Sequence, residues 1–323
     1  MRPVLVLGGY GALGRHCVAE LLARTRAPVR IAGRNAQRAE SLALAHGERV
    51  RASYVDATDP RVLARVVEGA ALVVACCGGS ALAALQTALE LRAGFIGVSP
   101  LRLEPRSEKH VAELAWRAQV PVVLHAGAVP GIPGLLAESL VRRVPEIAKL
   151  ELASTGPFLA SDTARRDQAE ARELAGGSSR LALPELWSFP EPVGRAACAA
   201  ASSADLAGFA ERHCVAALRY LEPSDGALGR IMARVLGRRA AAGFAVTARA
   251  FAPGDVNEPA ATAELSAPDP LPLAAASVGA LAAAALDGRV AAGLSLARDA
   301  LAPAQLLGEL EKRGARIEIR ARG

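Results

Sequence analysis

Glycines near the N-terminus recur at a spacing that can hold a diphosphate group. Gly9, Gly11 and Gly14 fit G-x-G-x-x-G, and Gly8 permits a second reading, G-x-x-G-x-x-G. Glycines at these places give a tight turn, a backbone that a diphosphate can approach, and close packing of a helix on a strand. The N–H groups that begin a helix near Ala12 attract anions. The segment therefore predicts a dinucleotide-binding turn, made of Gly8, Gly9, Tyr10, Gly11, Ala12, Leu13 and Gly14.

The residue that ends the next predicted strand indicates which dinucleotide is held. The strand over 29–34 ends at Arg34, where a site selective for NAD carries Asp or Glu, about 20 residues beyond the glycines. A guanidinium group can bind the 2′-phosphate of NADP through paired, charge-assisted hydrogen bonds. Asn35 and Arg38 follow closely enough to reach the same phosphate. We therefore expect NADP (NADPH) as the cofactor. The alternative, open above all for Arg38, is an arginine surface that only water contacts.

A regular alternation of strands and helices is expected to position these residues. An aliphatic strand precedes the glycines, and an apolar-periodic helix follows them. Repeated strand–helix winding predicts an α/β fold whose N-terminal part is a Rossmann-type doubly wound parallel sheet. Its six strands are expected over 4–7, 29–34, 51–56, 71–76, 95–99 and 120–124.

Residues that follow these strands meet at the sheet edge where doubly wound sheets bind their ligands. Asp56 can hydrogen-bond the adenine or, equally, cap the next helix. Buried packing is favoured over catalysis for the thiols of Cys76 and Cys77, so their backbone is the expected contact. The expected cofactor contacts at this edge are Asp56, Ala57, Cys76, Cys77, Gly78, Ser99 and Gly127.

The second half of the chain has the pattern of a separate α+β domain. Alternating or β-branched runs predict an antiparallel or mixed sheet with strands over 147–154, 213–221, 243–251 and 260–267. Helices are expected in the intervals. One is a solvated helix over 163–175, followed by a Gly/Ser connector, or alternatively a lid, at 176–179.

Composition limits the class of protein. The chain has 323 residues, 52% hydrophobic and 22% charged, which favours a folded chain with room for two cores. Only 3% of residues are aromatic, and the net charge of +6 comes from interspersed arginines, so we expect no nucleic-acid partner. Five cysteines without disulfide-framework spacing or a C-x-x-C pair predict reduced thiols, a cytoplasmic location and no metal site. Without a signal-like segment or 18 consecutive apolar residues, we expect no membrane association.

Three segments together resemble the saccharopine dehydrogenase-like reductases. They are Gly-Gly-Tyr-Gly-Ala-Leu-Gly at 8–14, Ala-Gly-Arg-Asn at 32–35, and the loop from His125 to Ala137. The alanine-rich helix after Leu271 and the Gly293-Leu294-Ser295 segment are similar to that family too. The resemblance implies three parts: an NADP-binding Rossmann domain over 1–126, an inserted α+β substrate and dimerisation domain over 127–270, and C-terminal helices and a strand over 271–323 that return towards the first domain.

The same resemblance implies a reaction and an assembly. It implies hydride transfer between NADPH and the C=N bond, or a C=O or C=C bond, of a small amino-acid-derived or acyl substrate, by a homodimer. Many members of the family carry an acidic residue before the Pro-Gly of the loop after the sixth strand, where this chain has Ala128-Val129. That departure keeps a second class open, an NADP(H)-binding sensor or regulatory protein with reduced catalysis.

Few residues qualify as the proton donor that such a reduction needs. His125 ends the sixth predicted strand, and an imidazole can supply a proton near neutral pH, so it is the best candidate. The alternative is a structural histidine bonded to backbone. Each of the three tyrosines lacks a lysine four residues on, so the Tyr–Lys pair of short-chain dehydrogenases is absent. Weaker candidates are Asp162, Arg165 and His213.

Overall fold

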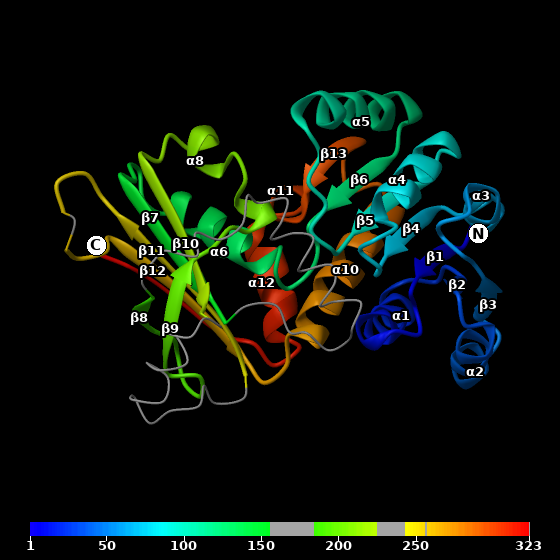
Figure 1. The fold of residues 1–323 in the computed structure, drawn as a ribbon, viewed down its shortest axis with the longest axis horizontal. Helices are drawn as coiled ribbons and strands as arrows, with labels where there is room; N and C mark the ends of the chain where they lie inside the picture. The colour runs from blue at the N-terminus through cyan, green and yellow to red at the C-terminus, as the bar shows by residue number, and fades with distance from the viewer. Residues whose placement is uncertain (156–183, 225–242, 256, 323) are drawn as a thin grey trace. The chain divides into compact units, whose positions relative to one another are not determined.

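The computed structural model describes residues 1–155, 184–224, 243–255 and 257–322. The described chain divides into two compact units (Figure 1). Unit 1 holds Met1–Gly127 and Leu271–Ala302, and unit 2 holds the described residues of 128–270 and 303–322. The predicted third segment, 271–323, is thus shared between the two units. The helix expected over 163–175, the connector at 176–179, Asp162 and Arg165 lie outside the described residues.

Unit 1 is built on a parallel sheet of seven strands. The predicted Rossmann-type doubly wound sheet is confirmed, and the strand order reverses between β1 and β4, where such sheets bind nucleotides. The seventh strand, β13, comes from the tail and pairs with β6. In spatial order the strands are β13 (Gly293–Leu296), β6 (Pro121–Leu124), β5 (Gly94–Gly97), β4 (Leu72–Ala75), β1 (Val4–Leu7), β2 (Val29–Gly33) and β3 (Val50–Tyr54).

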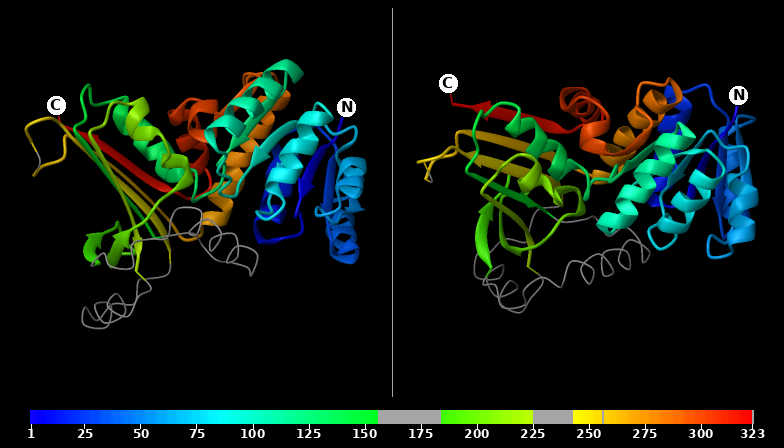
Figure 2. Two further views of the ribbon diagram at one scale, coloured as in Figure 1. Left: turned by 45° about the horizontal axis from the view of Figure 1, so that its top comes forward. Right: turned by 90° about the horizontal axis from the view of Figure 1, so that it is seen from above.

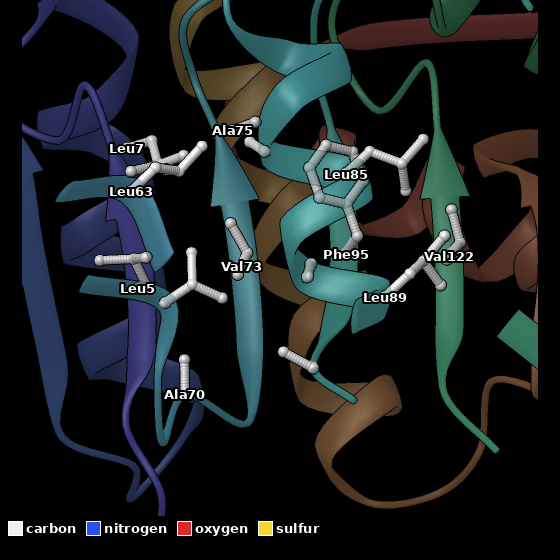
Figure 3. Close-up of a cluster of buried hydrophobic side chains, with 14 of the residues drawn as sticks. Leu5, Leu7, Leu63, Ala70, Val73, Ala75, Leu85, Leu89, Phe95 and Val122 are labelled. Carbon is white, nitrogen blue, oxygen red and sulfur yellow. The ribbon is translucent and has the colours of Figure 1, made fainter. Parts of the chain in front are cut away.

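Helices connect these strands and bury both faces of the sheet. Leu5 and Leu7 of β1 join Phe95 of β5 in an apolar core (Figure 3), to which α3, α4 and α5 also contribute buried residues. Elsewhere in the unit, α1 packs on α10 so closely that a Cβ on Gly279 would lie 2.8 Å from the Cβ of Glu20. The helices are α1 (Ala12–Arg24), α2 (Ala36–His46), α3 (Pro60–Val67), α4 (Ala81–Glu90), α5 (Pro105–Ala118), α10 (Pro270–Leu286) and α11 (Ala297–Ala300).

Unit 2 contains a mixed sheet, as the alternating runs predicted. β7 and β10 pair in parallel, and the remaining neighbours are antiparallel. Helix α6 lies against this sheet (Figure 2), and the strands beneath it present Leu150, Leu152 and Val246 among the buried residues. The spatial order is β14 (Arg316–Ala321), β12 (Ala261–Ala267), β11 (Phe244–Phe251), β7 (Lys149–Ser154), β10 (Ala217–Pro223), β9 (Arg195–Ala200) and β8 (Glu185–Ser188). The helical segments are α6 (Ile132–Val141), η1 (Ala204–Leu206), α8 (Phe209–Arg212) and α12 (Pro303–Glu311).

Candidate nucleotide-binding site

The glycine turn begins directly where β1 ends. Gly8 has a φ of +74°, a left-handed conformation that a side chain makes costly, so glycine is required there. Its N–H donates to the carbonyl of Ala32 at 2.8 Å, and its own carbonyl accepts the N–H of Gly11 at 2.9 Å. Because Gly8 supplies the tight turn, the G-x-x-G-x-x-G reading describes the backbone better than the reading that starts at Gly9.

The start of helix α1 lies against this turn with no room for a side chain. A Cβ on Gly14 would stand 2.2 Å from the carbonyl oxygen of Gly8 and 2.6 Å from the Cα of Gly9. A Cβ on Gly11 would stand 3.0 Å from the same oxygen. The obstructing atoms are backbone, so they cannot rotate away. The glycines therefore fix how closely the helix N-terminus approaches the end of β1.

The N-terminus of α1 has the features of an anion site. Its N-cap is Gly11, which provides no side-chain cap, and the first turn contains no acidic residue. The N–H groups of a first helical turn and the helix dipole attract phosphate when no side chain occupies them. Ala12 and Leu13, half-buried, lie in this turn. The cradle therefore fits the diphosphate of a dinucleotide.

The segment after β4 forms a wall beside the glycine turn. The carbonyl oxygen of Cys76 would lie 3.4 Å from a Cβ on Gly8, and the Cys76 N–H donates to the carbonyl of Leu7. The Cys76 thiol lies 3.8 Å from the sulfur of Cys17, and that contact together with burial raises the pKa of Cys76 well above its usual value. The Cys77 sulfur contacts the Ser80 hydroxyl at 3.2 Å. Both thiols thus contact protein neighbours, while the backbone of Cys76 and the Cβ of Cys77 border the turn.

Arg34 stands exposed at the corner between β2 and α2. Asn35 is the N-cap of α2, and its side-chain oxygen accepts the N–H of Arg38 at 2.9 Å. Hydrogen bonds from the hydroxyl and the N–H of Thr58, with a further contribution from the Arg34 guanidinium, lower the pKa of Asp56. Asp56 is therefore a carboxylate at neutral pH near Arg34.

The alternative role of Asp56 as a helix cap is wrong. Asp59 caps α3, because its carboxylate accepts the N–H groups of Arg61 and Val62 at 2.8 and 3.3 Å. Pro60, at the start of that helix, suits a position whose N–H would have no helical partner. The Asp59-Pro60 pair in the sequence was the signal for this cap. Asp56 instead closes a local turn with Thr58.

The remaining expected contacts lie after four strands of the same sheet. Ala57 follows β3 and Ser99 follows β5, and both are half-buried. Gly78 follows β4 and is half-buried, whereas Gly127, after β6, is buried at the last position of unit 1 before the chain enters unit 2. All of them follow carboxyl ends of parallel strands, which is the ligand-binding edge of this fold.

His125 directly follows β6 and has a constrained backbone. Its φ is +59°, its side chain is 5% exposed, and its Nε2 lies 3.0 Å from the carbonyl oxygen of Leu101. Such a contact is typical of a structural histidine bonded to backbone, which is the alternative interpretation of this residue. A catalytic role for His125 stays a prediction.

The loop after β6 enters unit 2 and is anchored by a residue that the sequence interpretation missed. Asp205 is 2% exposed, and its Oδ2 accepts the N–H groups of Gly131 and Gly134 at 2.9 and 2.7 Å. Ser203 donates to the other oxygen. This buried carboxylate caps α6 from more than 70 residues away, a contact that no local pattern announces.

Unit 2 also contains a buried polar cluster around Tyr220. The Tyr220 hydroxyl contacts the Ser154 hydroxyl at 2.6 Å and donates to Glu222 at 3.0 Å. Burial, and then the charge of Glu222, raise the pKa of Tyr220 well above its usual value. The Nε2 of His213, a weaker proton-donor candidate, lies 3.0 Å from Oε2 of Glu138. The described residues contain no group of His, Cys, Asp and Glu side chains that could hold a metal ion.

Comparison with known proteins agrees with this geometry. Residues 8–126 match the NAD(P)H-binding family model. An apo, histidine-tagged saccharopine dehydrogenase (L-Glu forming) from Saccharomyces cerevisiae aligns with 99% of this chain and 100% of its own, with a TM-score of 0.66 and 13% identity. This chain has the saccharopine dehydrogenase fold. The predicted resemblance is therefore confirmed for the fold and for the presence of an NAD(P)H-binding domain.

Other comparisons reach a smaller part of the chain. An alignment with a short-chain dehydrogenases/reductase from Veillonella parvula covers 38% of this chain and 68% of the other, with a TM-score of 0.29 and 17% identity. A search of curated proteins gives no match. None of the helices in the described ranges combines the length and the apolar character that crossing a membrane requires. The comparisons thus show the saccharopine dehydrogenase fold and an NAD(P)H-binding domain.

Proposed function

We propose that this chain is an NADPH-dependent oxidoreductase. The observation that carries the proposal is the glycine cradle followed by Arg34 at the end of β2, in a chain that shares a dehydrogenase fold over its whole length. A carboxylate at the position of Arg34 would repel a 2′-phosphate, whereas a guanidinium binds it. The proposed substrate is a small amino-acid-derived or acyl compound with a C=N, C=O or C=C bond.

Each part of the site has a proposed role. The N-terminus of α1 holds the diphosphate, and Arg34 with Asn35 binds the 2′-phosphate, which Arg38 approaches from the next turn of α2. Asp56 accepts a hydrogen bond from the adenine, and the backbone of Cys76 and Cys77 borders the dinucleotide. When bound, NADPH supplies a hydride, and the protein's task is to orient the acceptor and provide a proton.

We also propose the conditions in which the protein works. A homodimer follows from the resemblance, and a cytoplasmic location follows from the five free cysteines, since thiols stay reduced there. The proposed partner is a small-molecule substrate, without nucleic acid or membrane. Size-exclusion chromatography with light scattering would give the mass of the assembly directly.

A pair of assays tests the proposal. Oxidation of NADPH, followed at 340 nm, is measured against a panel of imines, keto acids and enoyl thioesters. In parallel, Arg34→Asp should weaken NADPH binding by about tenfold or more, because hydrogen bonds to charged groups contribute about 1.5–3 kcal/mol. The same variant should leave NADH binding unchanged or improved. Wild-type protein that binds NADH more tightly than NADPH would overturn the cofactor assignment.

Two observations favour the second candidate, an NADP(H)-binding sensor with reduced catalysis. The Nε2 of His125, the best proton-donor candidate in the sequence, contacts the backbone carbonyl of Leu101. In addition, this chain has Ala128-Val129 where many members of the family carry an acidic residue. Tight NADPH binding with no turnover across the panel would favour the sensor. Turnover that persists in His125→Ala would show that another group or solvent provides the proton.

A further inference from the structure

Tyr10 belongs to the glycine turn by sequence, but its side chain reaches the turn between β2 and α2. A Cβ on Gly33 would lie 2.5 Å from Cε1 of Tyr10 and 2.7 Å from its hydroxyl oxygen. The ring therefore rests directly on the backbone of Gly33, which only glycine permits. The Tyr10 hydroxyl also accepts the N–H of Asn35 at 3.0 Å.

These two contacts lie on either side of Arg34. Gly33 precedes Arg34 and packs under the Tyr10 ring, and Asn35 follows Arg34 and donates to the Tyr10 hydroxyl. Arg34 itself is exposed, so burial at its own position does not restrain it. A single side chain from the diphosphate-binding turn thus holds both neighbours of the arginine.

We propose that Tyr10 is a positioning residue for the 2′-phosphate, which sets cofactor preference by holding the turn that carries Arg34. This inference rests on the proposed function, since it assumes that Arg34 binds that phosphate. Fixing the backbone of an arginine reduces the conformational entropy that it loses on binding an anion. NADPH and NADH differ only in the 2′-phosphate, so a residue that acts through Arg34 changes affinity for one and leaves the other unaffected.

The test removes the hydroxyl and keeps the ring. Tyr10→Phe retains the packing on Gly33 and loses the hydrogen bond to Asn35. Affinities are measured by calorimetry for NADPH and NADH, and for the fragments adenosine 2′,5′-bisphosphate and AMP. We expect Tyr10→Phe to weaken the two 2′-phosphorylated ligands by about three- to tenfold, the range of one hydrogen bond. NADH and AMP should bind as they do to wild type.

Two further variants sharpen the test. Tyr54→Phe is the matched control, because it removes the hydroxyl of a tyrosine that is 54% exposed at the end of β3. It should change no affinity. Gly33→Ala should reduce the preference for 2′-phosphorylated ligands by displacing the Tyr10 ring, and it should have little additional effect in Tyr10→Ala, since the two changes act through one contact.

The outcomes separate this inference from the proposed function. If wild-type protein shows no preference for 2′-phosphorylated ligands, the proposed NADPH specificity fails and the role of Tyr10 fails with it. If wild type prefers them and Tyr10→Phe keeps that preference, or loses affinity equally for all four ligands, only the role of Tyr10 is overturned. A selective loss in Tyr10→Phe, absent in Tyr54→Phe, supports it.

Discussion

The replacement of Gly14 by alanine tests the cradle most severely, because the new methyl group meets only backbone. Its Cβ would lie 2.2 Å from the Gly8 oxygen, 2.6 Å from the Gly9 Cα and 2.8 Å from the Gly9 carbonyl carbon. An ordinary contact begins at 3.4 Å, so α1 and the turn must separate by roughly 1 Å. Overpacking of this kind costs about 1–3 kcal/mol, of which better helix propensity offsets about 1 kcal/mol.

The same displacement removes hydrogen bonds to the diphosphate. An N–H group that moves by roughly 1 Å from an optimal contact lies outside hydrogen-bonding distance, and bonds to a charged group contribute about 1.5–3 kcal/mol each. We therefore expect Gly14→Ala to raise the dissociation constants for NADPH and NADH together, by about tenfold or more. Calorimetric titration measures this change, and thermal unfolding shows that the variant is folded at the temperature used.

Gly308→Ala is the matched control for this prediction. Gly308 also lies inside a helix, α12, but a Cβ there would have no atom within 4 Å. The substitution should stabilise the protein by up to about 1 kcal/mol and leave nucleotide affinity unchanged. The reasoning is refuted if Gly14→Ala binds NADPH within twofold of wild type, since the start of α1 would then contribute nothing to binding.

Three further predictions concern stability and reactivity. Contact with Cys17 and burial raise the pKa of Cys76, so its thiol should react slowly with iodoacetamide at pH 8. Mass spectrometry should therefore show that the exposed Cys214 is labelled first, and equally fast labelling of Cys76 would contradict this. Asp205→Ala leaves the N–H groups of Gly131 and Gly134 without their acceptor. Urea denaturation should therefore show a free energy of unfolding about 2–4 kcal/mol lower than that of wild type. A loss below about 0.5 kcal/mol would show that the cap is dispensable. Burial raises the pKa of Tyr220 above its usual 10.0, so the unfolded state loses this proton first and stability falls as the pH rises past 10. When the free energy of unfolding is compared at pH 9 and pH 11, Tyr220→Phe should lack that part of the fall, about 1.4 kcal/mol in total, and an unchanged fall would contradict the prediction.

The parallel sheet could be predicted because its strands are short aliphatic runs bounded by glycine or polar residues. Strand β1, Val4–Leu7, is an uninterrupted aliphatic run that is buried on both faces of the sheet, which is the pattern of a central parallel strand. Three strands of unit 2 were missed. β14 carries charged residues in alternation with isoleucine, and β8 and β9 contain few β-branched residues, so their pairing depends on partners distant in sequence.

The site could be predicted where its contacts are local. The glycine turn directly follows β1, and Arg34 directly follows β2. Because the strands fix these positions, the spacing of the residues along the sequence was enough to predict the site. Contacts that cross the fold could not be predicted. Tyr10 contacts Asn35 across 25 residues, and Asp205 caps α6 across more than 70. Such pairs follow from packing in three dimensions, for which the local sequence pattern carries no signal.

The central claim is that the cradle and Arg34 bind NADPH in preference to NADH. Titration of the wild-type protein with each dinucleotide in the same buffer measures this directly, as the ratio of two dissociation constants. Charge-assisted hydrogen bonds from Arg34 to the 2′-phosphate predict a ratio of about ten or more in favour of NADPH. Equal affinities, or tighter binding of NADH, would contradict the account.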